Sequence, residues 1–378
     1  MSDRFPRKSR KAVIVQRRKL AVLLAGLLIL IALILAGAAL IRGCEKEKPY
    51  DTEAGTTDSG TAEMTDAPDP GTGPAAETEG ETSPPDTVPE DSAPAATEPV
   101  TELAETKPPR VDFAFPDEMA SRHALLIDLD KWEVIAQKDP DAVVYPASIT
   151  KIMTVLLAVE HLPDPDMTTS ISAETILDLI SRNAARAGFE AGEQITVRDL
   201  EAAALLPSGA DAAVALAELI SGSEEAFADL MNARAAEIGM KHTHFVTCTG
   251  LHRDAHVSSC SDLALLVKEA LKNEAFRAVF ELKTYRTPAT PEHPWGLSCE
   301  STMLRGLEAL GYSTDRYVGG KTGYTPEAGL CLASVAKIEG KEYLLITLTA
   351  GTGSNQPPLH VMDADLIWSA FEAWLAEG

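Results

Sequence analysis

The stretch Glu45–Arg110 most strongly limits what this chain can fold into. It consists mostly of Thr, Pro, Glu, Asp, Ala and Gly, and its acidic side chains far outnumber its basic ones. A segment so poor in apolar side chains buries too little surface to offset the loss of chain entropy on folding. We therefore predict a disordered acidic linker over residues 45–110, which leaves residues 111–378 as the folded domain.

A basic cluster and an uncharged run precede this linker. Residues 1–19 are rich in Lys and Arg, and the run from 20 to 41 holds no charged side chain. As a helix rising by about 1.5 Å per residue, that run spans roughly 30 Å, the thickness of a bilayer's hydrocarbon core. A cleavable signal has a shorter apolar core, so we predict an uncleaved transmembrane signal anchor over 20–41. Lipidation of Cys44 is disfavoured, because Arg42 fits a lipidation motif poorly.

The same flanking charges predict where the chain lies in the cell. Basic residues beside a membrane-spanning helix stay in the cytoplasm. Residues 1–19 are therefore expected to be a cytoplasmic basic segment, and the chain is expected to cross the cell membrane once. The folded domain, residues 111–378, is then extracytoplasmic.

The overall charge excludes one class of partner. The chain has 33 Lys and Arg against 57 Asp and Glu, a net charge of −24, and the excess of acidic side chains extends into the folded domain. A surface that binds nucleic acid must neutralise phosphates with basic side chains. We therefore expect no nucleic acid among the partners.

The hydrophobic pattern of residues 111–378 predicts an α+β domain. Apolar runs at 123–128 and 132–137 indicate an early hairpin, and runs at 317–324, 330–338 and 343–348 indicate three late strands. Helical spacing is found at 148–162, 197–220 (with a break at 207–209), 224–239, 261–273 and 363–377. Strands at both ends of a helical block favour one antiparallel five-stranded sheet with a helical subdomain over βαβ alternation.

A predicted helix start holds a serine and a lysine three positions apart. Residues at this spacing share a helix face, so Lys151 can reach the Ser148 hydroxyl. A serine becomes a nucleophile only beside a base, and a lysine serves as one only when burial or a second cation lowers its pKa. Lys321 is a candidate for that second cation. Alone, a Ser-x-x-Lys pair is more often a helix cap and a solvated lysine.

Two further short motifs are equally ambiguous when each is read alone. The segment Pro207–Asp211, PSGAD, breaks a helix and can present the Ser208 hydroxyl to a cleft. In the segment GGKTGY, Lys321 and Thr322 offer a cation and a hydroxyl to a carboxylate, and Gly323 lets a ligand approach the backbone closely. The simpler interpretations are a plain helix connection and a glycine-weakened strand.

Together, the three motifs resemble those of penicillin-binding proteins and serine β-lactamases. Ser148 comes first along the chain, Ser208 second and Lys321 third, and a series of Ser-x-x-Lys, Ser-x-Asn and Lys-Thr-Gly in this order marks these enzymes. The surrounding text, including YPASITKIMT, SGADAAVALAE and GKTGYT, is most similar to the serine D-alanyl-D-alanine carboxypeptidases. These are the low-molecular-weight penicillin-binding proteins of peptidase family S11, and the similarity extends over about residues 115–360.

This resemblance implies the transpeptidase-like fold shared by penicillin-binding proteins and serine β-lactamases. It also implies an enzyme that removes the terminal D-alanine from peptidoglycan pentapeptide stems through an acyl-enzyme. By match to the family's motifs, Ser148 would be the nucleophile and Lys151 its base. Ser208 would relay a proton to the departing D-alanine.

The resemblance also implies how substrate is held. Lys321 and Thr322 would bind the terminal carboxylate, with Gly323 and Tyr324 completing the substrate site. The backbone N–H groups of Ser148 and Tyr324 would form the oxyanion hole. β-Lactams would acylate the serine as covalent inhibitors, and neither a cofactor nor a metal is expected.

Ala210 departs from the family pattern, which usually has asparagine at this position. That amide contacts the substrate and the catalytic lysine, so the effect of alanine on activity is left open. Two alternatives remain: a serine β-lactamase, or a membrane-anchored receptor that binds β-lactams or wall peptides with little turnover. A class A β-lactamase needs a deacylating glutamate after the second motif, and no convincing candidate is present.

Other candidate ligands lie between His242 and Cys260, where His and Cys side chains are clustered. Their spacing matches no zinc motif, so we expect structural roles for them. Cys248 with Cys260, and Cys299 with Cys331, are candidate disulfides of an extracytoplasmic domain. Sequence alone cannot decide the pairing.

Overall fold

The computed structural model of the chain describes residues 113–352 and 357–377. The predicted basic segment (1–19), signal anchor (20–41) and linker (45–110) lie outside the described residues. Among the helices that are described, none is long and apolar enough to cross a membrane.

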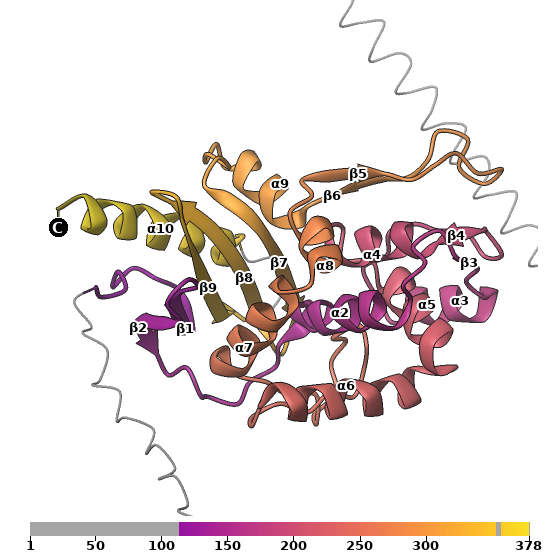
Figure 1. The fold of residues 1–378 in the computed structure, drawn as a ribbon, viewed down its shortest axis with the longest axis horizontal. Helices are drawn as coiled ribbons and strands as arrows, with labels where there is room; N and C mark the ends of the chain where they lie inside the picture. Colours follow the sequence, from indigo (N-terminus) through magenta and orange to yellow (C-terminus); the bar gives the residue numbers. More distant parts are fainter. Residues whose placement is uncertain (1–112, 353–356, 378) are drawn as a thin grey trace, which may run out of the picture. The chain divides into compact units, whose positions relative to one another are not determined.

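A five-stranded antiparallel sheet is the central element of the described domain (Figure 1). Its strands are β1 (Ser121–Asp128), β2 (Glu133–Lys138), β7 (Tyr317–Thr325), β8 (Gly329–Ile338) and β9 (Lys341–Ala350). Their order is β2-β1-β9-β8-β7, so the early hairpin is joined to the late strands by pairing of β1 with β9. The predicted α+β class with one antiparallel five-stranded sheet is confirmed.

The helices occupy the middle of the chain and its end. They are η1 (Ala147–Thr150), α2 (Lys151–His161), α3 (Ala173–Ser181), α4 (Val197–Leu205), α5 (Ala210–Ser221), α6 (Glu224–Ile238), α7 (Cys260–Leu271), α8 (Glu274–Phe280), α9 (Thr302–Ala309) and α10 (Leu359–Glu377). Two small hairpins accompany them, β3 (Thr168–Thr169) with β4 (Ile195–Thr196), and β5 (Thr284–Arg286) with β6 (Ser298–Glu300). The predicted helices are present, whereas α3, α8 and α9 were not predicted.

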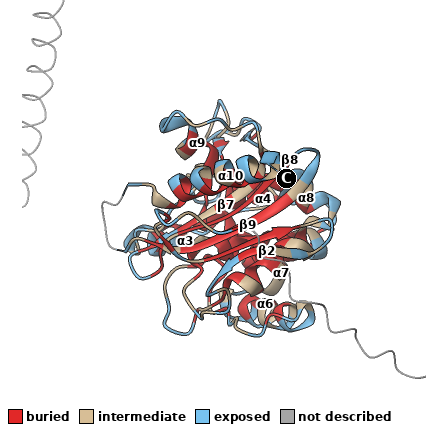
Figure 2. Ribbon diagram, turned by 90° about the vertical axis from the view of Figure 1, so that its left-hand side faces the viewer, coloured by how far each residue is buried: buried red, intermediate tan, exposed pale blue. Residues whose placement is uncertain are grey.

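Alternating side chains along the strands divide the core into two layers. In β9, Leu344 and Ile346 pack with buried residues of α2, α4, α5 and α7, whereas Tyr343 and Leu345 pack with α10 residues such as Trp368 on the other face. Successive side chains of a strand point to opposite faces, which explains the division. Figure 2 shows the buried strands between α10 on one side and α7 on the other.

Capping side chains fix where helices of the middle region begin and end. Ser223 Oγ accepts a hydrogen bond from the backbone N–H of Ala226 at the start of α6, and Thr196 and Asp199 form a reciprocal capping box at the start of α4. Gly239 ends α6 with a φ of 88°, a conformation that favours glycine. Local chemistry therefore sets the helix boundaries that position the site.

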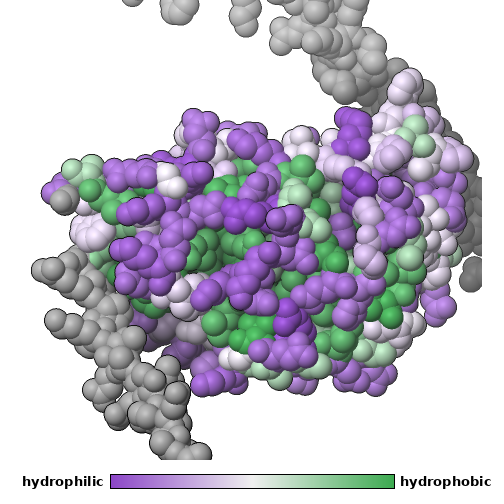
Figure 3. Space-filling model, in the orientation of Figure 1, coloured by the Kyte–Doolittle hydropathy of each residue, from purple (hydrophilic) through white to green (hydrophobic). Residues whose placement is uncertain are grey.

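The exposed surface of the domain is mainly hydrophilic. On the face seen in Figure 3, hydrophilic side chains break up the apolar areas between them. Apolar side chains that do reach the surface include Leu177 and Ile180 on α3, and Met362 and Leu366 on α10. Nothing in the described structure shows what covers them.

Candidate active site

One large cavity, of about 980 Å³, lies where β7 meets η1 and the break between α4 and α5. Residues from all three sequence motifs line it: Ser148, Lys151, Ser208, Ala210, Thr322, Gly323 and Tyr324. Lys321 is fully buried immediately beside it. The structure therefore brings together every residue that the sequence singled out for chemistry.

Ser148 lies in the short helix η1, and Lys151 is the first residue of α2, which follows η1 directly. Lys151 Nζ donates to Ser148 Oγ over 2.9 Å and to the backbone carbonyl of Thr249 over 2.7 Å. The lysine is only 1% exposed, and this burial lowers its pKa to about 8, although neighbouring acidic groups act in the opposite direction. Lys151 is therefore placed and tuned to accept the serine proton near neutral pH.

Ser208 and Lys321 form the second pair of the site. Ser208 lies between α4 and α5 with a φ of 66°, and Lys321 Nζ donates to Ser208 Oγ and to the carbonyl of Thr322, each over 2.8 Å. Burial lowers the pKa of Lys321 well below its usual value, and the charge of Lys151 lowers it further. The two lysines are thus close enough for the charge of one to oppose the charge of the other.

Asp211 holds one wall of the cavity in place. Its carboxylate accepts hydrogen bonds from the backbone N–H groups of Ala187 (2.8 Å) and Gly188 (2.9 Å), which follow α3. Ala210 adds a further bond, from its N–H to the carbonyl of Ala185, over 2.7 Å. At the position where the resemblance leads one to expect asparagine, the chain therefore presents only a methyl group to the cavity.

β7 is an edge strand of the sheet, and it runs beside η1. A Cβ added to Gly323 would lie 3.0 Å from the carbonyl oxygen of Pro146 and 3.1 Å from the backbone N of Ser148. Only glycine permits this approach without displacing one of the two segments. The outer edge of such a strand is suited to pairing with an extended peptide.

Several residues in or beside the cavity were not predicted. Thr249 contributes a backbone carbonyl, which no side-chain motif signals. Thr302 on α9 shares a 2.6 Å hydrogen bond with the hydroxyl of Thr322. Arg305 on α9 and His360 on α10 also line the cavity, and burial, followed by the charge of Lys321, lowers the pKa of His360 to about 4.

The cavity is basic, although the chain is strongly acidic. Besides Lys151, its lining includes Arg182, Arg253 and Arg305, against a single acidic residue, Glu327. A cleft lined by one sign of charge attracts ligands of the opposite sign. The site is therefore suited to an anionic ligand.

In the His and Cys cluster, His256 makes hydrogen bonds within the fold and the cysteines are buried. Among the described residues, no group of three His, Cys, Asp or Glu side chains is placed to hold a metal ion. The Nδ1 atom of His256 accepts from the N–H of Val246 (3.0 Å), so its proton lies on Nε2, which donates to Thr150 Oγ1 over 2.8 Å. Cys248, Cys260, Cys299 and Cys331 are all buried free thiols, so neither of the disulfides considered from the sequence is present.

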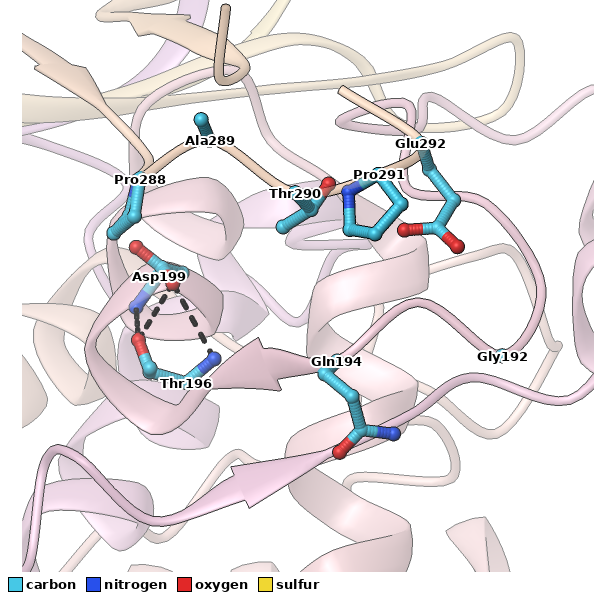
Figure 4. Close-up of a pocket in the computed structure, with 9 residues that line it drawn as sticks. All are labelled: Gly192, Gln194, Thr196, Asp199, Pro288, Ala289, Thr290, Pro291 and Glu292. Carbon is cyan, nitrogen blue, oxygen red and sulfur yellow. Dashed lines mark hydrogen bonds between the residues drawn. The ribbon is translucent and has the colours of Figure 1, made fainter. Parts of the chain in front are cut away.

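A second hollow, of about 350 Å³, lies between the β5–β6 hairpin and the start of α4 (Figure 4). Its polar groups are used within the fold: Asp199 accepts from the Thr196 hydroxyl over 2.6 Å and from Tyr285 over 2.7 Å. Nearby, Glu193 accepts from Thr290 and interacts with His293. These contacts fasten the hairpin to the helical region.

Comparison with known proteins supports the family that the three sequence motifs resemble. The family model of D-alanyl-D-alanine carboxypeptidase, Peptidase S11, matches residues 110–352. D-alanyl-D-alanine carboxypeptidase DacF of Bacillus subtilis is 33% identical over 255 residues, which are 67% of this chain and 63% of DacF. The chain therefore spans less than two thirds of that relative's length.

Another relative and a solved structure are also similar to this chain. A D-alanyl-D-alanine endopeptidase of Pseudomonas aeruginosa is 31% identical over 66% of this chain and 78% of its own length. Among solved structures, the Streptomyces K15 DD-transpeptidase matches with a TM-score of 0.61 and 28% identity, over 68% of this chain and 99% of that one.

Proposed function

We propose, because the chain belongs to the S11 family of D-alanyl-D-alanine carboxypeptidases, that it is a serine D,D-carboxypeptidase. Its substrate is the peptidoglycan pentapeptide stem, from which it removes the terminal D-alanine. β-Lactams act on it as covalent inhibitors. The activity needs no cofactor or metal, because the serine supplies the nucleophile and lysine the base.

Acylation begins with the 2.9 Å contact between Lys151 Nζ and Ser148 Oγ. Neutral Lys151 takes the serine proton as Oγ attacks the carbonyl between the last two D-alanines. The N–H groups of Ser148 and Tyr324 stabilise the oxyanion, at about 3–4 kcal/mol per donor. When the C–N bond breaks, the leaving amine takes a proton relayed by Ser208, and water then hydrolyses the acyl-enzyme.

Substrate binding uses the basic end of the cavity. Lys321 and Thr322 hold the terminal carboxylate, with Arg305 nearby on the cavity wall. The peptide backbone pairs along the edge of β7, where Gly323 allows close approach. With a charge-assisted contact of this kind, we expect the substrate to need a free terminal carboxylate.

The observation that carries this proposal is the meeting of two hydrogen-bonded pairs at one cavity. Lys151 with Ser148 comes from the start of α2, and Lys321 with Ser208 comes from β7 and the α4–α5 break. A chance Ser-x-x-Lys does not bring a second buried lysine and a second serine beside it.

The test is release of D-alanine from a D-Ala-D-Ala pentapeptide by the full-length chain purified in detergent. We expect release by the wild type, and loss of both release and penicillin labelling in Ser148→Ala. Rapid penicillin turnover without D-alanine release would identify a β-lactamase instead. Stable labelling without release would identify a receptor, and continued release by Ser148→Ala would exclude the nucleophile.

We further propose that the chain is held in the cell membrane by residues 20–41, with the catalytic domain outside. Support comes from the basic cluster in 1–19 and the uncharged run that follows it. The acidic linker, 45–110, would let the domain reach wall peptides at a distance from the membrane.

Cys44 offers a reporter for this topology, because the four cysteines of the domain are buried. We expect a membrane-impermeant thiol reagent to label intact cells that produce the wild type but not Cys44→Ser. Deleting residues 1–41 should move the protein out of the membrane fraction. Labelling of Cys44 only after cell lysis would contradict the proposed orientation.

A further inference from the structure

Glu224, at the first position of α6, lies behind the catalytic lysine and belongs to none of the three sequence motifs. One of its oxygens, Oε1, accepts hydrogen bonds from both the backbone N–H of Cys248 (3.1 Å) and its thiol (3.2 Å). Burial raises the pKa of that thiol well above its usual value, so Cys248 keeps its proton and can donate it. The carboxylate thus anchors the turn at Cys248 through two donors.

The anchored turn is the one that binds the lysine. The carbonyl of Cys248 accepts from Thr154 Oγ1 over 2.6 Å, and the next carbonyl, that of Thr249, accepts from Lys151 Nζ over 2.7 Å. The residue after it, Gly250, has a φ of 75°, and a Cβ there would overlap the carbonyl of Ala147. The turn is therefore held from α6, from α2 and from η1, and its position fixes the acceptor that orients Lys151.

We propose that Glu224 is a positioning residue: it holds the Cys248–Thr249 turn against Lys151 and places its carboxylate behind the lysine. This inference rests on the proposed function only through the role of Lys151 as the base for Ser148. Glu224 itself touches neither the serine nor the cavity that holds the substrate. Its influence passes through the turn and through its charge.

The charge has a defined effect on the lysine. Burial lowers the pKa of Lys151 to about 8, and Glu224 is among the groups that raise it against this burial. Since Cys248 stays a neutral thiol, Asp211 and Glu224 supply the negative charge on this side. Asp211 also accepts three backbone N–H groups, so Glu224 is the carboxylate whose charge can be removed with least change to the cavity wall.

Other charged groups surround Glu224 and Lys151. The charge of Lys151 contributes to lowering the pKa of Lys321 on β7 and of His256. Glu224 faces a neighbouring hollow of about 310 Å³, whose other charged lining residues are Glu174, Asp178, Glu218 and Arg182, the last of which also lines the large cavity. Burial, and to a lesser degree the charge of Glu224, raises the pKa of Glu218. Apart from Lys151, none of these groups has a hydrogen bond to the Cys248–Thr249 turn.

The test compares Glu224→Gln with Glu224→Ala, and uses Glu225→Gln as the matched control. Gln keeps an oxygen for the Cys248 N–H but removes the charge, whereas Ala removes both. Glu225 is the next residue of α6 but is exposed. Its change to Gln therefore removes an equal charge and leaves the contacts of the Cys248–Thr249 turn unchanged. The readout is the rate of acylation of Ser148 by a penicillin between pH 5.5 and 9.5.

We expect the acid limb of Glu224→Gln to move to lower pH by roughly half a unit, because the lysine loses its proton more easily without the carboxylate. Its plateau rate should stay within about twofold of the wild type, because the turn keeps its acceptor. Glu224→Ala should show the same shift and a plateau lower by about tenfold. Glu225→Gln should follow the wild type. A Glu224→Gln profile that overlays the wild type would overturn the proposal.

A second measurement makes the outcome independent of turnover. Titration of ¹⁵N-labelled lysine side chains by NMR reports Lys151 directly, and the resonance is assigned by its loss in Lys151→Met. We expect the Lys151 titration to move to lower pH in Glu224→Gln but not in Glu225→Gln. Failure of D-alanine release with this shift intact would reject the carboxypeptidase activity alone, and an unmoved titration would reject the role of Glu224 alone.

Discussion

Lys321 Nζ lies 2.8 Å from Ser208 Oγ, a contact that joins β7 to the distant α4–α5 break. Because the lysine donates in this bond, Ser208 acts as the acceptor and its own hydroxyl proton remains for another partner. A serine held in this way is suited to pass a proton to a departing amine. In the proposed mechanism, Lys321 thus has two tasks, binding the substrate carboxylate and orienting the relay.

Ser208→Ala should separate these two tasks. The variant keeps Lys321 but removes the proton relay, so we expect kcat for D-alanine release to fall by about 10²–10³-fold with a smaller change in KM. Labelling by penicillin should be slowed but should still occur on Ser148. A kcat within about threefold of the wild type would exclude Ser208 from proton transfer.

The pH dependence of acylation follows from the buried lysine. Lys151 accepts the Ser148 proton only when neutral, and its pKa is lowered to about 8. The rate should therefore rise with pH through about 8, and at pH 6 it should be about a hundredfold below the plateau. The measurement is the second-order rate of penicillin acylation across pH 5.5–9.5. A flat profile between pH 6 and 8.5 would show that a different group serves as the base.

Ala210→Asn tests the departure in the second motif. Ala210 is 2% exposed and packs in the core, but it also lines the cavity, so we expect a longer side chain there to extend toward the cavity. One added hydrogen bond to substrate should raise kcat/KM for the pentapeptide by about tenfold. The control is Ala212→Asn, at a fully buried position of the same helix, which should only destabilise the fold. Unchanged or lower kcat/KM in Ala210→Asn, with Tm preserved, would show that the cavity works without the amide.

Local spacing made part of this site predictable. Ser148 and Lys151 meet because residues three apart on a helical turn share a face, and the structure shows the contact that the spacing indicates. The strands were predictable for a similar reason, since β7, β8 and β9 are apolar runs bounded by turns. The antiparallel class followed from their order along the chain.

Long-range features were not predictable from the sequence alone. The acceptor for Lys151 is the carbonyl of Thr249, and a backbone carbonyl leaves no mark on residue type. Arg305 and His360 reach the cavity from α9 and α10, whose patterns are dominated by packing on the sheet. The disulfide expectations failed because a cysteine count does not show which thiols meet, and Cys248 instead bonds to Glu224.

Gly323→Ala tests whether the closeness of β7 and η1 is needed for catalysis or only for folding. The added Cβ would lie 3.0 Å from the Pro146 carbonyl and 3.1 Å from the Ser148 N, tighter than ordinary van der Waals contact. One of the two segments must then give by a few tenths of an ångström, and we expect this shift to disturb the two N–H groups proposed to stabilise the oxyanion. We expect kcat to fall by about 10²-fold or more, measured as D-alanine release, while thermal unfolding changes by only a few degrees, roughly the effect of 1 kcal/mol.

The matched comparison is Gly306→Ala on α9, where the atoms nearest to the new Cβ belong to the side chain of Val361, at 3.2 Å or more. That variant adds the same methyl group to the domain but leaves the contact between β7 and η1 unchanged. It should therefore keep near wild-type activity. Equal losses in both variants would assign the effect of Gly323 to stability rather than to the oxyanion site.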